Sequence, residues 1–417
     1  SIWITDEKTK DYFITHDRPG DFRELKPGPL AQYDKLIELD LSKVEPMIAL
    51  PFHPSNTYPL AEVIKNPLDA MAQIEVNAMD VYENNTGITW NLKNKVREGR
   101  LYVDQGVVAG CCSGFFENIY GISRLAVHLE QGIGTFDFSI YPASQPIMYE
   151  LNRIGALNNL IEYGVQVKSA FCGPCFGAGG TPGHNTLSIR HTTRNFPNRE
   201  GANPAIGQFA SVALMDSRSI AATAFNRGLL TSSKDCWIEM KVPPYRFNKE
   251  IYERTVFNGF GKAQPSADIV YGPDIKDWPT LPPLPENLLL RVASVIHDEV
   301  TTTDELIPSG EIASYRSNPN KISRYTLIRR DPAYVGRATE VHKYEQARQA
   351  GDEARVAQYY EVLGNIGINT SDAILLKTTG IGSVLYAKRP GDGSAREYAA
   401  SCQRVLGGWA NISLEYA

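Results

Sequence analysis

The segment that constrains the fold and chemistry of this chain most strongly reads Ser169-Ala-Phe-Cys-Gly-Pro-Cys-Phe-Gly-Ala-Gly-Gly-Thr-Pro-Gly183. It holds two cysteines, Cys172 and Cys175, at a spacing that suits a redox disulfide, a zinc site or an iron–sulfur cluster. A redox Cys-Gly-Pro-Cys motif opens a helix, whereas here four glycines and Pro182 follow within eight residues. A loop of this composition suits backbone that lies close to a bulky ligand. The pattern favours a cluster; a zinc site with His184 or His191, a redox dithiol and two buried thiols remain as alternatives.

Arginines follow the cysteine pair closely, in the segment Ser188-Ile-Arg-His-Thr-Thr-Arg-Asn-Phe-Pro-Asn-Arg-Glu-Gly-Ala-Asn-Pro204. They are Arg190, Arg194 and Arg199. The planar guanidinium group matches the geometry of a carboxylate and binds it through two hydrogen bonds. Beside a metal centre, these arginines predict a small polyanionic substrate.

Together the two segments resemble the aconitase family of hydro-lyases, whose pattern is Cys-Gly-Pro-Cys, a Gly-containing loop, Arg-Asn-Phe-x-x-Arg and Ala-Asn-Pro. The matching residues here are 172–175, 194–199 and 202–204. The resemblance implies a 4Fe–4S cluster held by Cys172, Cys175 and a third cysteine from the segment Val107-Val-Ala-Gly-Cys-Cys-Ser-Gly114. If Gly110 is aligned with the glycine of the family's motif Gly-Ser-Cys-Thr-Asn, the third ligand is Cys112. If Glu117 is aligned with the later acidic residue of the family, the third ligand is Cys111. Three thiolates leave one iron open to a substrate hydroxyl.

Size and composition fit an ordinary globular protein of two or three domains: 417 residues, 42% hydrophobic and 21% charged. The net charge of -5 gives no general attraction to nucleic acid or to an anionic membrane. No apolar run is long enough to span a bilayer, and the first residues are too charged for a signal peptide. We therefore expect a cytoplasmic protein that binds neither membrane nor nucleic acid.

Strand and helix patterns alternate from about residue 98, which predicts an α/β fold with a parallel sheet. Strands are expected at 33–41, 101–109, 136–141, 165–171, 288–296, 373–376 and 384–387. Helices are expected at 115–131, 145–152, 158–163 and 345–363, with one or two more in 204–228. The resemblance implies a three-layer domain of the aconitase type and a C-terminal swivelling β/α domain. We divide the chain into the end of a preceding domain (1–75), a cluster-binding domain (76–235), a proline-rich linker (236–286) and an incomplete swivelling domain (287–417).

Two segments of the last region carry candidate site residues. Residues 301–318 resemble the family's Thr-Thr-Asp-His segment and the substrate arginine twelve positions beyond its Asp, which are Asp304 and Arg316 here. A structural Asp–Arg pair is the alternative. The turn Gly391-Asp-Gly-Ser394 precedes a predicted helix and resembles the family's Gly-x-Gly-Ser-Ser-Arg-Glu motif. That resemblance implies that Ser394 is the catalytic base and that Arg396 binds substrate, and a simple helix cap is the alternative.

The resemblance covers nearly all of this chain but only the later half of a full family member. Four positions depart from the family pattern: Gly114, Thr193, Glu305 and Ala395. We predict a hydro-lyase that acts on a hydroxylated di- or tricarboxylate, and the departures leave the substrate open. We expect the chain alone, without the upstream domains as partners, to be inactive. The alternative is a catalytically inactive homologue that binds a ligand or RNA.

Overall fold

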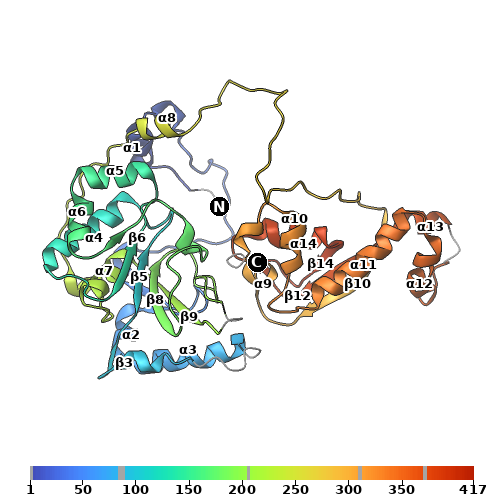
Figure 1. Cartoon of the computed structure of the whole chain (residues 1–417), viewed down its shortest axis with the longest axis horizontal. Helices are drawn as coiled ribbons and strands as arrows, with labels where there is room; N and C mark the ends of the chain where they lie inside the picture. The colour runs from blue at the N-terminus through green and yellow to red at the C-terminus, as the bar shows by residue number, and fades with distance from the viewer. Residues whose placement is uncertain (1–2, 83–89, 204–206, 309–311, 370–372) are drawn as a thin grey trace. The chain divides into compact units, whose positions relative to one another are not determined.

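Short apolar segments of the first unit, Ser1–Gln264, form a seven-stranded sheet in the order β2-β1-β9-β8-β5-β6-β7. The computed structural model describes residues 3–82, 90–203, 207–308, 312–369 and 373–417 (Figure 1). The strands are β1 (Met47–Ala49), β2 (Thr57–Pro59), β5 (Gln105–Val108), β6 (Asp137–Ile140), β7 (Gln166–Val167), β8 (Thr186–His191) and β9 (Ala210–Met215). β3 (Val96–Arg97) and β4 (Arg100–Leu101) form a separate antiparallel pair.

The sheet is parallel from β9 through β8, β5 and β6 to β7, as the alternation of strand and helix predicts. At its other edge, β1 runs antiparallel to both β2 and β9. Residues 50–56, which join β1 to β2, are too few for a crossover but enough for a hairpin. The predicted parallel sheet therefore carries an antiparallel edge.

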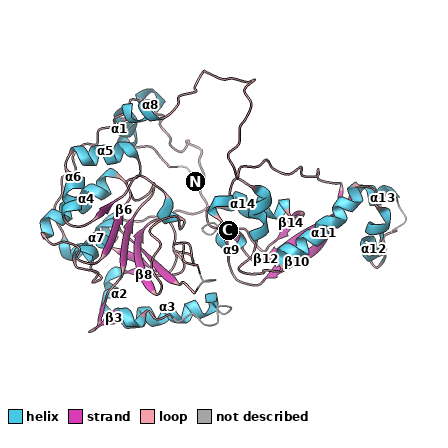
Figure 2. Cartoon of the chain, viewed as in Figure 1, coloured by secondary structure: helices cyan, strands magenta, loops and turns pink. Residues whose placement is uncertain are grey.

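Helices cover one face of this sheet. α4 (Phe116–Leu129), α5 (Gln145–Arg153), α6 (Ala156–Glu162) and α7 (Ser217–Phe225) pack against one another beside the strands (Figure 2). The spacing of Ile119, Ile122 and Leu125 predicts a helix with one apolar face, and all three side chains are buried. The α/β class and this helix are thus confirmed.

A loop lies over the opposite face at β5. Side chains alternate along a strand, and a side chain at Gly106 would lie 3.1 Å from Ile220 of α7. The next residue, Val107, faces the other way, and its side chain lies 3.8 Å from the Cβ position of Gly180. The Gly-rich loop after the cysteine pair therefore forms the layer that covers Val107.

One predicted element of this unit is wrong. No strand forms at 33–41, a segment that the structure describes throughout and whose large apolar side chains are exposed. Alternating apolar residues form a strand only where a neighbouring strand can pair with them. The one or two helices predicted in 204–228 are confirmed as a single helix, α7. This helix begins only at Ser217, because the preceding apolar run 210–215 is strand β9, and such a short run has no periodicity that distinguishes strand from helix. The other helices of the unit are α1 (Glu7–Thr15), α2 (Leu60–Lys65), α3 (Pro67–Tyr82) and α8 (Glu250–Thr255).

The second unit, Pro265–Ala417, contains a parallel three-stranded sheet in the order β10-β12-β14 and a parallel pair, β11 and β13. The strands are β10 (Asn287–Ile296), β11 (Thr301–Thr302), β12 (Thr379–Ala387), β13 (Pro390–Asp392) and β14 (Gly408–Ile412). The helices are α9 (Thr303–Leu306), α10 (Pro319–Ile322), α11 (Tyr334–Gln349), α12 (Glu353–Gly364), α13 (Ala373–Thr378) and α14 (Arg396–Val405). The strands predicted at 288–296 and 384–387 are confirmed.

Two other predictions for this unit are wrong. The single helix predicted at 345–363 is broken between α11 and α12, where Gly351 has a φ of +76° and the Asp352 side chain caps α12. The strand predicted at 373–376 is α13, which continues directly into β12. Within the described ranges, no helix combines the length and the apolar character needed to cross a bilayer.

Candidate functional site

The cysteine pair lies in a tight turn after the short strand β7. Residues Gly173–Cys175 form a 3-10 helix, and the backbone N–H groups of Phe176 and Ala178 both donate to the carbonyl of Gly173. A side chain at Gly173 would lie 2.2 Å from the carbonyl oxygen of Ala178. The compact turn therefore requires glycine at this position.

The loop after β5 meets this turn at Gly110. Gly110 has a φ of +88°, and a Cβ atom there would lie 2.8 Å from Cys175 Sγ. The same sulfur lies 3.8 Å from the carbonyl oxygen of Ala109. The turn that carries Cys172 and Cys175 thus lies against the loop that carries Cys111 and Cys112.

Three of the predicted thiols interact electrostatically. Burial, and then the neighbouring thiols of Cys172 and Cys112, raise the pKa of Cys175 to about 11. Cys175 is buried, whereas Cys111, Cys112 and Cys172 are exposed, and Cys112 Sγ lies 3.1 Å from Ser113 Oγ. Cys175 is therefore protonated at neutral pH, and a metal would have to displace its proton.

The donor set fits an iron–sulfur cluster in its chemistry, since thiolates from two loops are its usual ligands. In the part of the chain that the structure describes, no three His, Cys, Asp or Glu side chains converge closely enough to hold a metal ion. The exposed side chains of Cys112 and Cys172 would have to move towards Cys175 to share one.

Gly114, one of the departures from the family pattern, has a structural explanation. A side chain at Gly114 would lie 2.4 Å from the carbonyl oxygen of Tyr141 and 2.6 Å from the backbone nitrogen of Ala143. Ala143 also donates a hydrogen bond to the carbonyl of Gly114. This backbone contact leaves no room for the asparagine of the family pattern.

The three arginines of 188–204 have different environments. Arg194 and Arg199 are half-buried, and Arg194 Nη1 donates to Thr193 Oγ1 at 3.0 Å. Arg190 is 1% exposed and directs its guanidinium group into the protein. The prediction that it helps to bind an anionic substrate is therefore wrong. Pro204 of the Ala-Asn-Pro motif lies outside the described residues.

Asn195 holds the arginine segment in place, a role that the sequence did not reveal. Its Nδ2 atom is buried and donates to the carbonyls of Ala49 and Leu50, at 3.2 and 2.9 Å. Those carbonyls lie at the end of β1, more than 140 positions earlier in the chain. Only the sheet order, with β1 beside β9, brings the two segments together.

In the second unit, the Ser394 turn lies beside the segment that carries Asp304. β11 and β13 pair in parallel, with Thr302 opposite Asp392. A side chain at Gly393 would lie 2.1 Å from Thr303 Oγ1. The two motifs are neighbours within this unit although about 90 residues separate them in the chain.

Ser394 does not cap the helix that follows it. The N-cap of α14 is Ala395, and no side chain caps its first turn. Ser394 and Arg396 are exposed, and Arg396 Nε donates to the carbonyl of Gly393 at 2.9 Å. The interpretation of Ser394 as a cap therefore does not hold.

Glu305, which stands where the family pattern has histidine, is part of a capping box. Its carboxylate accepts from the backbone N–H and the hydroxyl of Thr302, and Thr302 Oγ1 accepts from the N–H of Glu305. Glu305 also forms an ion pair with Arg330. Asp304 beside it is buried, and Arg316 is half-buried. Glu305 thus has a structural role.

Replacing Glu305 with alanine should lower the free energy of unfolding by about 0.5–2 kcal/mol, the usual value of a helix cap. Urea unfolding followed by circular dichroism measures the change. Glu305→Gln retains an acceptor for the box and serves as the control. Equal stability of the wild type and Glu305→Ala would contradict the role.

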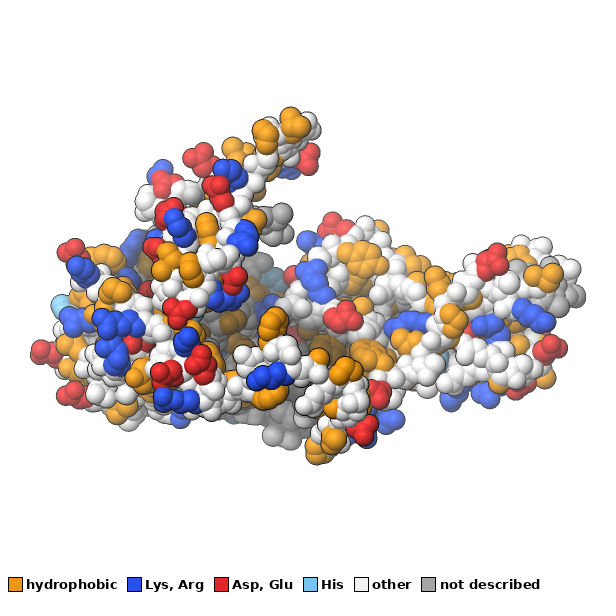
Figure 3. All heavy atoms as spheres, turned by 90° about the horizontal axis from the view of Figure 1, so that it is seen from above, with side chains coloured by type: hydrophobic (Ala, Val, Ile, Leu, Met, Phe, Trp, Pro, Cys, Tyr) orange, Lys and Arg blue, Asp and Glu red, His pale blue; other side chains and the backbone are white. Residues whose placement is uncertain are grey.

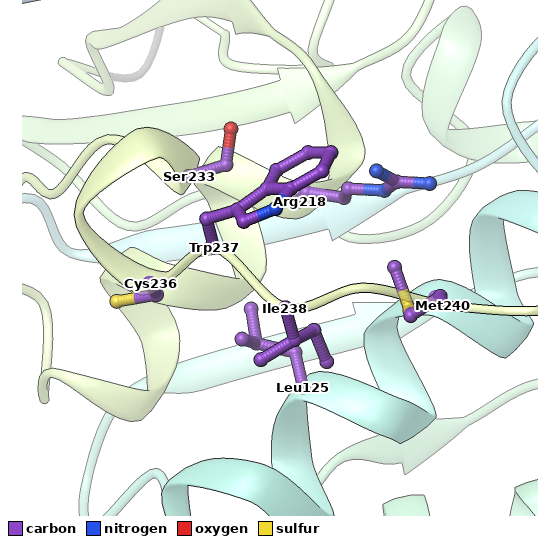
Figure 4. A pocket seen from close by; sticks show the side chains of 8 residues that line it. Leu125, Arg218, Ser233, Cys236, Trp237, Ile238 and Met240 are labelled. Carbon is purple, nitrogen blue, oxygen red and sulfur yellow. The ribbon is translucent and has the colours of Figure 1, made fainter.

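A shallow recess elsewhere in the first unit lies where residues 233–240 cross α4 and α7 (Figure 4). Its lining consists of Gly121, Leu125, Arg218, Ser233, Cys236, Trp237, Ile238 and Met240. None of the predicted site residues lines it, so the candidate site is separate from this recess.

Comparison with known proteins agrees with the cysteine and arginine motifs. The family model described as "Aconitase family (aconitate hydratase)" matches residues 1–222. The chain is 27% identical over its whole length to "Aconitate hydratase, mitochondrial" of Arthroderma benhamiae and 26% identical to the protein of that name from Emericella nidulans, covering 51% of each. Over 56% of its length it is 26% identical to the "3-isopropylmalate dehydratase large subunit" of Clostridium kluyveri, covering 46% of it.

The chain spans about half the length of the curated relatives it matches. The names of the two fungal relatives state a mitochondrial location, so they lend no support to the expected cytoplasmic location. Because the family match includes both cysteine loops and the arginine segment, and extends over more than half of the residues, the chain belongs to the aconitase family.

Proposed function

We propose that the chain provides the cluster ligands, the base and part of the substrate site of a hydro-lyase that acts on a hydroxylated di- or tricarboxylate. The observation that supports this most directly is the contact between Cys175 Sγ and Gly110, because it joins the two loops that carry the cysteines. Relatives named aconitate hydratase and 3-isopropylmalate dehydratase support the reaction class.

Cys112, Cys172 and Cys175 would hold a 4Fe–4S cluster. We favour Cys112 over Cys111 because aligning Gly110 with the family pattern places Cys112 at the ligand position. When bound, such a cluster supplies a Lewis-acidic iron with an open coordination position, which weakens the bond between carbon and the leaving hydroxyl.

The substrate carboxylates would be bound by arginines. In the first unit these are Arg194 and Arg199, held by the buried anchor at Asn195. In the second unit they are Arg316 and Arg396, with Asp304 as a further polar contact. Each charge-assisted hydrogen bond would stabilise bound substrate by about 1.5–3 kcal/mol. The arginines would also orient the carbon that loses its proton.

Ser394, as its alkoxide, would take the proton from the carbon next to the one that loses hydroxide, and the electron pair of that C–H bond would form the double bond. A serine hydroxyl is a weak base, so its negative charge needs stabilisation. The uncapped N–H groups of the first turn of α14 and the guanidinium group of Arg396 are the nearby donors.

Anaerobic reconstitution with iron and sulfide tests the proposal. Iron and sulfide per chain are measured in the 417-residue chain, and hydration of cis-aconitate and its analogues is followed by ultraviolet absorbance in the complete natural protein. We expect cluster binding in both and turnover in the complete protein. Cluster binding without turnover on any analogue would favour the inactive homologue that binds a ligand.

Absence of iron together with a reversible disulfide between Cys172 and Cys175 would favour a thiol–disulfide oxidoreductase instead. RNA binding after cluster loss has little electrostatic support. The net charge is -5, and positive and negative side chains are interspersed on the face in Figure 3.

A further inference from the structure

Arg190 on β8 is one of the most deeply buried side chains of the first unit, and every nitrogen of its guanidinium group donates a hydrogen bond. Nε donates to Ser188 Oγ at 3.0 Å, and Nη1 to the carbonyl of Pro174 at 2.9 Å. Nη2 donates to Gln105 Oε1 at 3.1 Å and to the carbonyl of Gly180 at 2.5 Å. Four of the five N–H donors of the guanidinium group thus have acceptors inside the protein.

These acceptors fall into two groups. Ser188 and Gln105 belong to the neighbouring strands β8 and β5, and Ser188 Oγ donates to Gln105 Oε1 at 2.8 Å. Pro174 and Gly180 belong to the cysteine turn and to the loop that follows it. One side chain therefore connects the cysteine turn to the sheet beneath it.

Arg190 also interacts electrostatically with Glu200, farther along the same segment. Burial lowers the pKa of Arg190 to about 10, and the carboxylate of Glu200, itself 3% exposed, acts in the opposite direction. Arg190 thus remains charged at neutral pH. Glu200 directly follows Arg199, and its neighbour Gly201 lies 2.8 Å from the Cβ position of Gly177 in the Gly-rich loop. Both side chains are buried, and the Gly-rich loop touches the arginine segment at Gly177 and Gly201.

We propose that Arg190 is a positioning residue that fixes the cysteine turn on β5 and β8 and keeps Cys175 against Gly110. The hydrogen bonds of Arg190 do not depend on the proposed function. Only the inference that Arg190 positions cluster ligands rests on it. The sheet, which folds from strands distant in sequence, would through this one side chain determine where the thiols lie.

Alkylation of the metal-free 417-residue chain by iodoacetamide tests the proposal, with fragment-ion mass spectrometry giving the rate at each cysteine. In Arg190→Met, Cys175 should react roughly tenfold faster or more, since one charge-assisted hydrogen bond corresponds to about a tenfold change in an opening equilibrium. Removing a positive charge alone would slow the reaction, because it disfavours the thiolate. A faster reaction therefore reports release of the turn.

Three controls separate release of the turn from general destabilisation. Cys236, which lines the recess at α4 and α7, should keep its wild-type rate in Arg190→Met. Arg190→Lys keeps the charge and should give an intermediate rate at Cys175. Arg153→Met removes the partner of the buried carboxylate of Glu150 on α5 and should leave Cys175 unchanged.

An unchanged rate at Cys175 in Arg190→Met, or an equal rise at Cys236, would overturn the positioning role. If Arg190→Met does not fold, the same measurement is made on Ser188→Ala, which removes one acceptor of Arg190 with little change in volume. A rise in the alkylation rate of Cys175 that is smaller than tenfold would support the role, and an unchanged rate would reject it. Iron content after reconstitution is measured separately. If the wild type binds no iron but Cys175 is released in Arg190→Met, the proposed function fails and the positioning role stands.

Discussion

Replacing Ser394 with alanine should lower turnover roughly 10²- to 10⁴-fold, the range that a general base contributes. The loss should fall on kcat, because Ser394 is proposed to act on the proton and the arginines to bind the carboxylates. Stability should be nearly unchanged, since Ser394 is exposed and does not cap α14. Steady-state kinetics of the complete natural protein and its thermal unfolding midpoint measure both effects.

Ser401→Ala is the matched control for this change. Ser401 lies on the same helix, and its hydroxyl donates to the carbonyl of Glu397 at 2.6 Å. Its removal should leave kcat unchanged. Equal turnover in the wild type and Ser394→Ala, with the cluster content verified in both, would contradict the assignment of the base.

Periodicity predicted the elements whose burial follows a simple pattern. Helix α4 has buried residues at helical spacing along one face, and the end of β12, residues 384–387, is a continuous apolar run that is mostly buried. In such segments the local pattern and the tertiary environment agree. The sequence was therefore sufficient for the α/β class and for much of the parallel sheet.

Strand β8 could not be predicted in this way. Its sequence, Thr-Leu-Ser-Ile-Arg-His, carries an arginine that ordinarily marks the surface, yet Arg190 is fully buried. Burial is possible because acceptors from β5 and from two loop carbonyls surround the guanidinium group. Those partners are distant in sequence, so the environment that makes Arg190 a core residue exists only in the fold.

The candidate site shows the same division. The motifs predicted the types of the site residues and their order in the chain. The effect of a residue that differs from the family pattern depends on the atoms packed around it. Gly114 is closed to a side chain by the backbone of 141–143, and Glu305 is committed to a capping box. Neither fact can be read from a comparison of motif letters. We infer that both departures reflect local packing and do not by themselves exclude a functional site.

The second large effect is expected at Gly110, where alanine should abolish most cluster binding by the reconstituted chain. Two costs add at this position. A φ of +88° strains any residue other than glycine by about 1–3 kcal/mol. The new methyl group would also lie 2.8 Å from Cys175 Sγ, and it would push the cysteine turn away from the loop that carries Cys112. Iron and sulfide per chain, measured beside the unfolding midpoint, report the loss.

Gly99→Ala separates these two costs. Gly99 has a φ of +74° and belongs to the same unit, but nothing lies within 4 Å of its Cβ position. It should show comparable strain and a similar loss of stability while it binds iron as the wild type does. If Gly110→Ala binds as much iron as Gly99→Ala, the close approach of the two loops is not required for the cluster. If only Gly110→Ala loses iron, the absence of a side chain at Gly110 is what lets the two loops approach closely enough for their thiols to share one cluster.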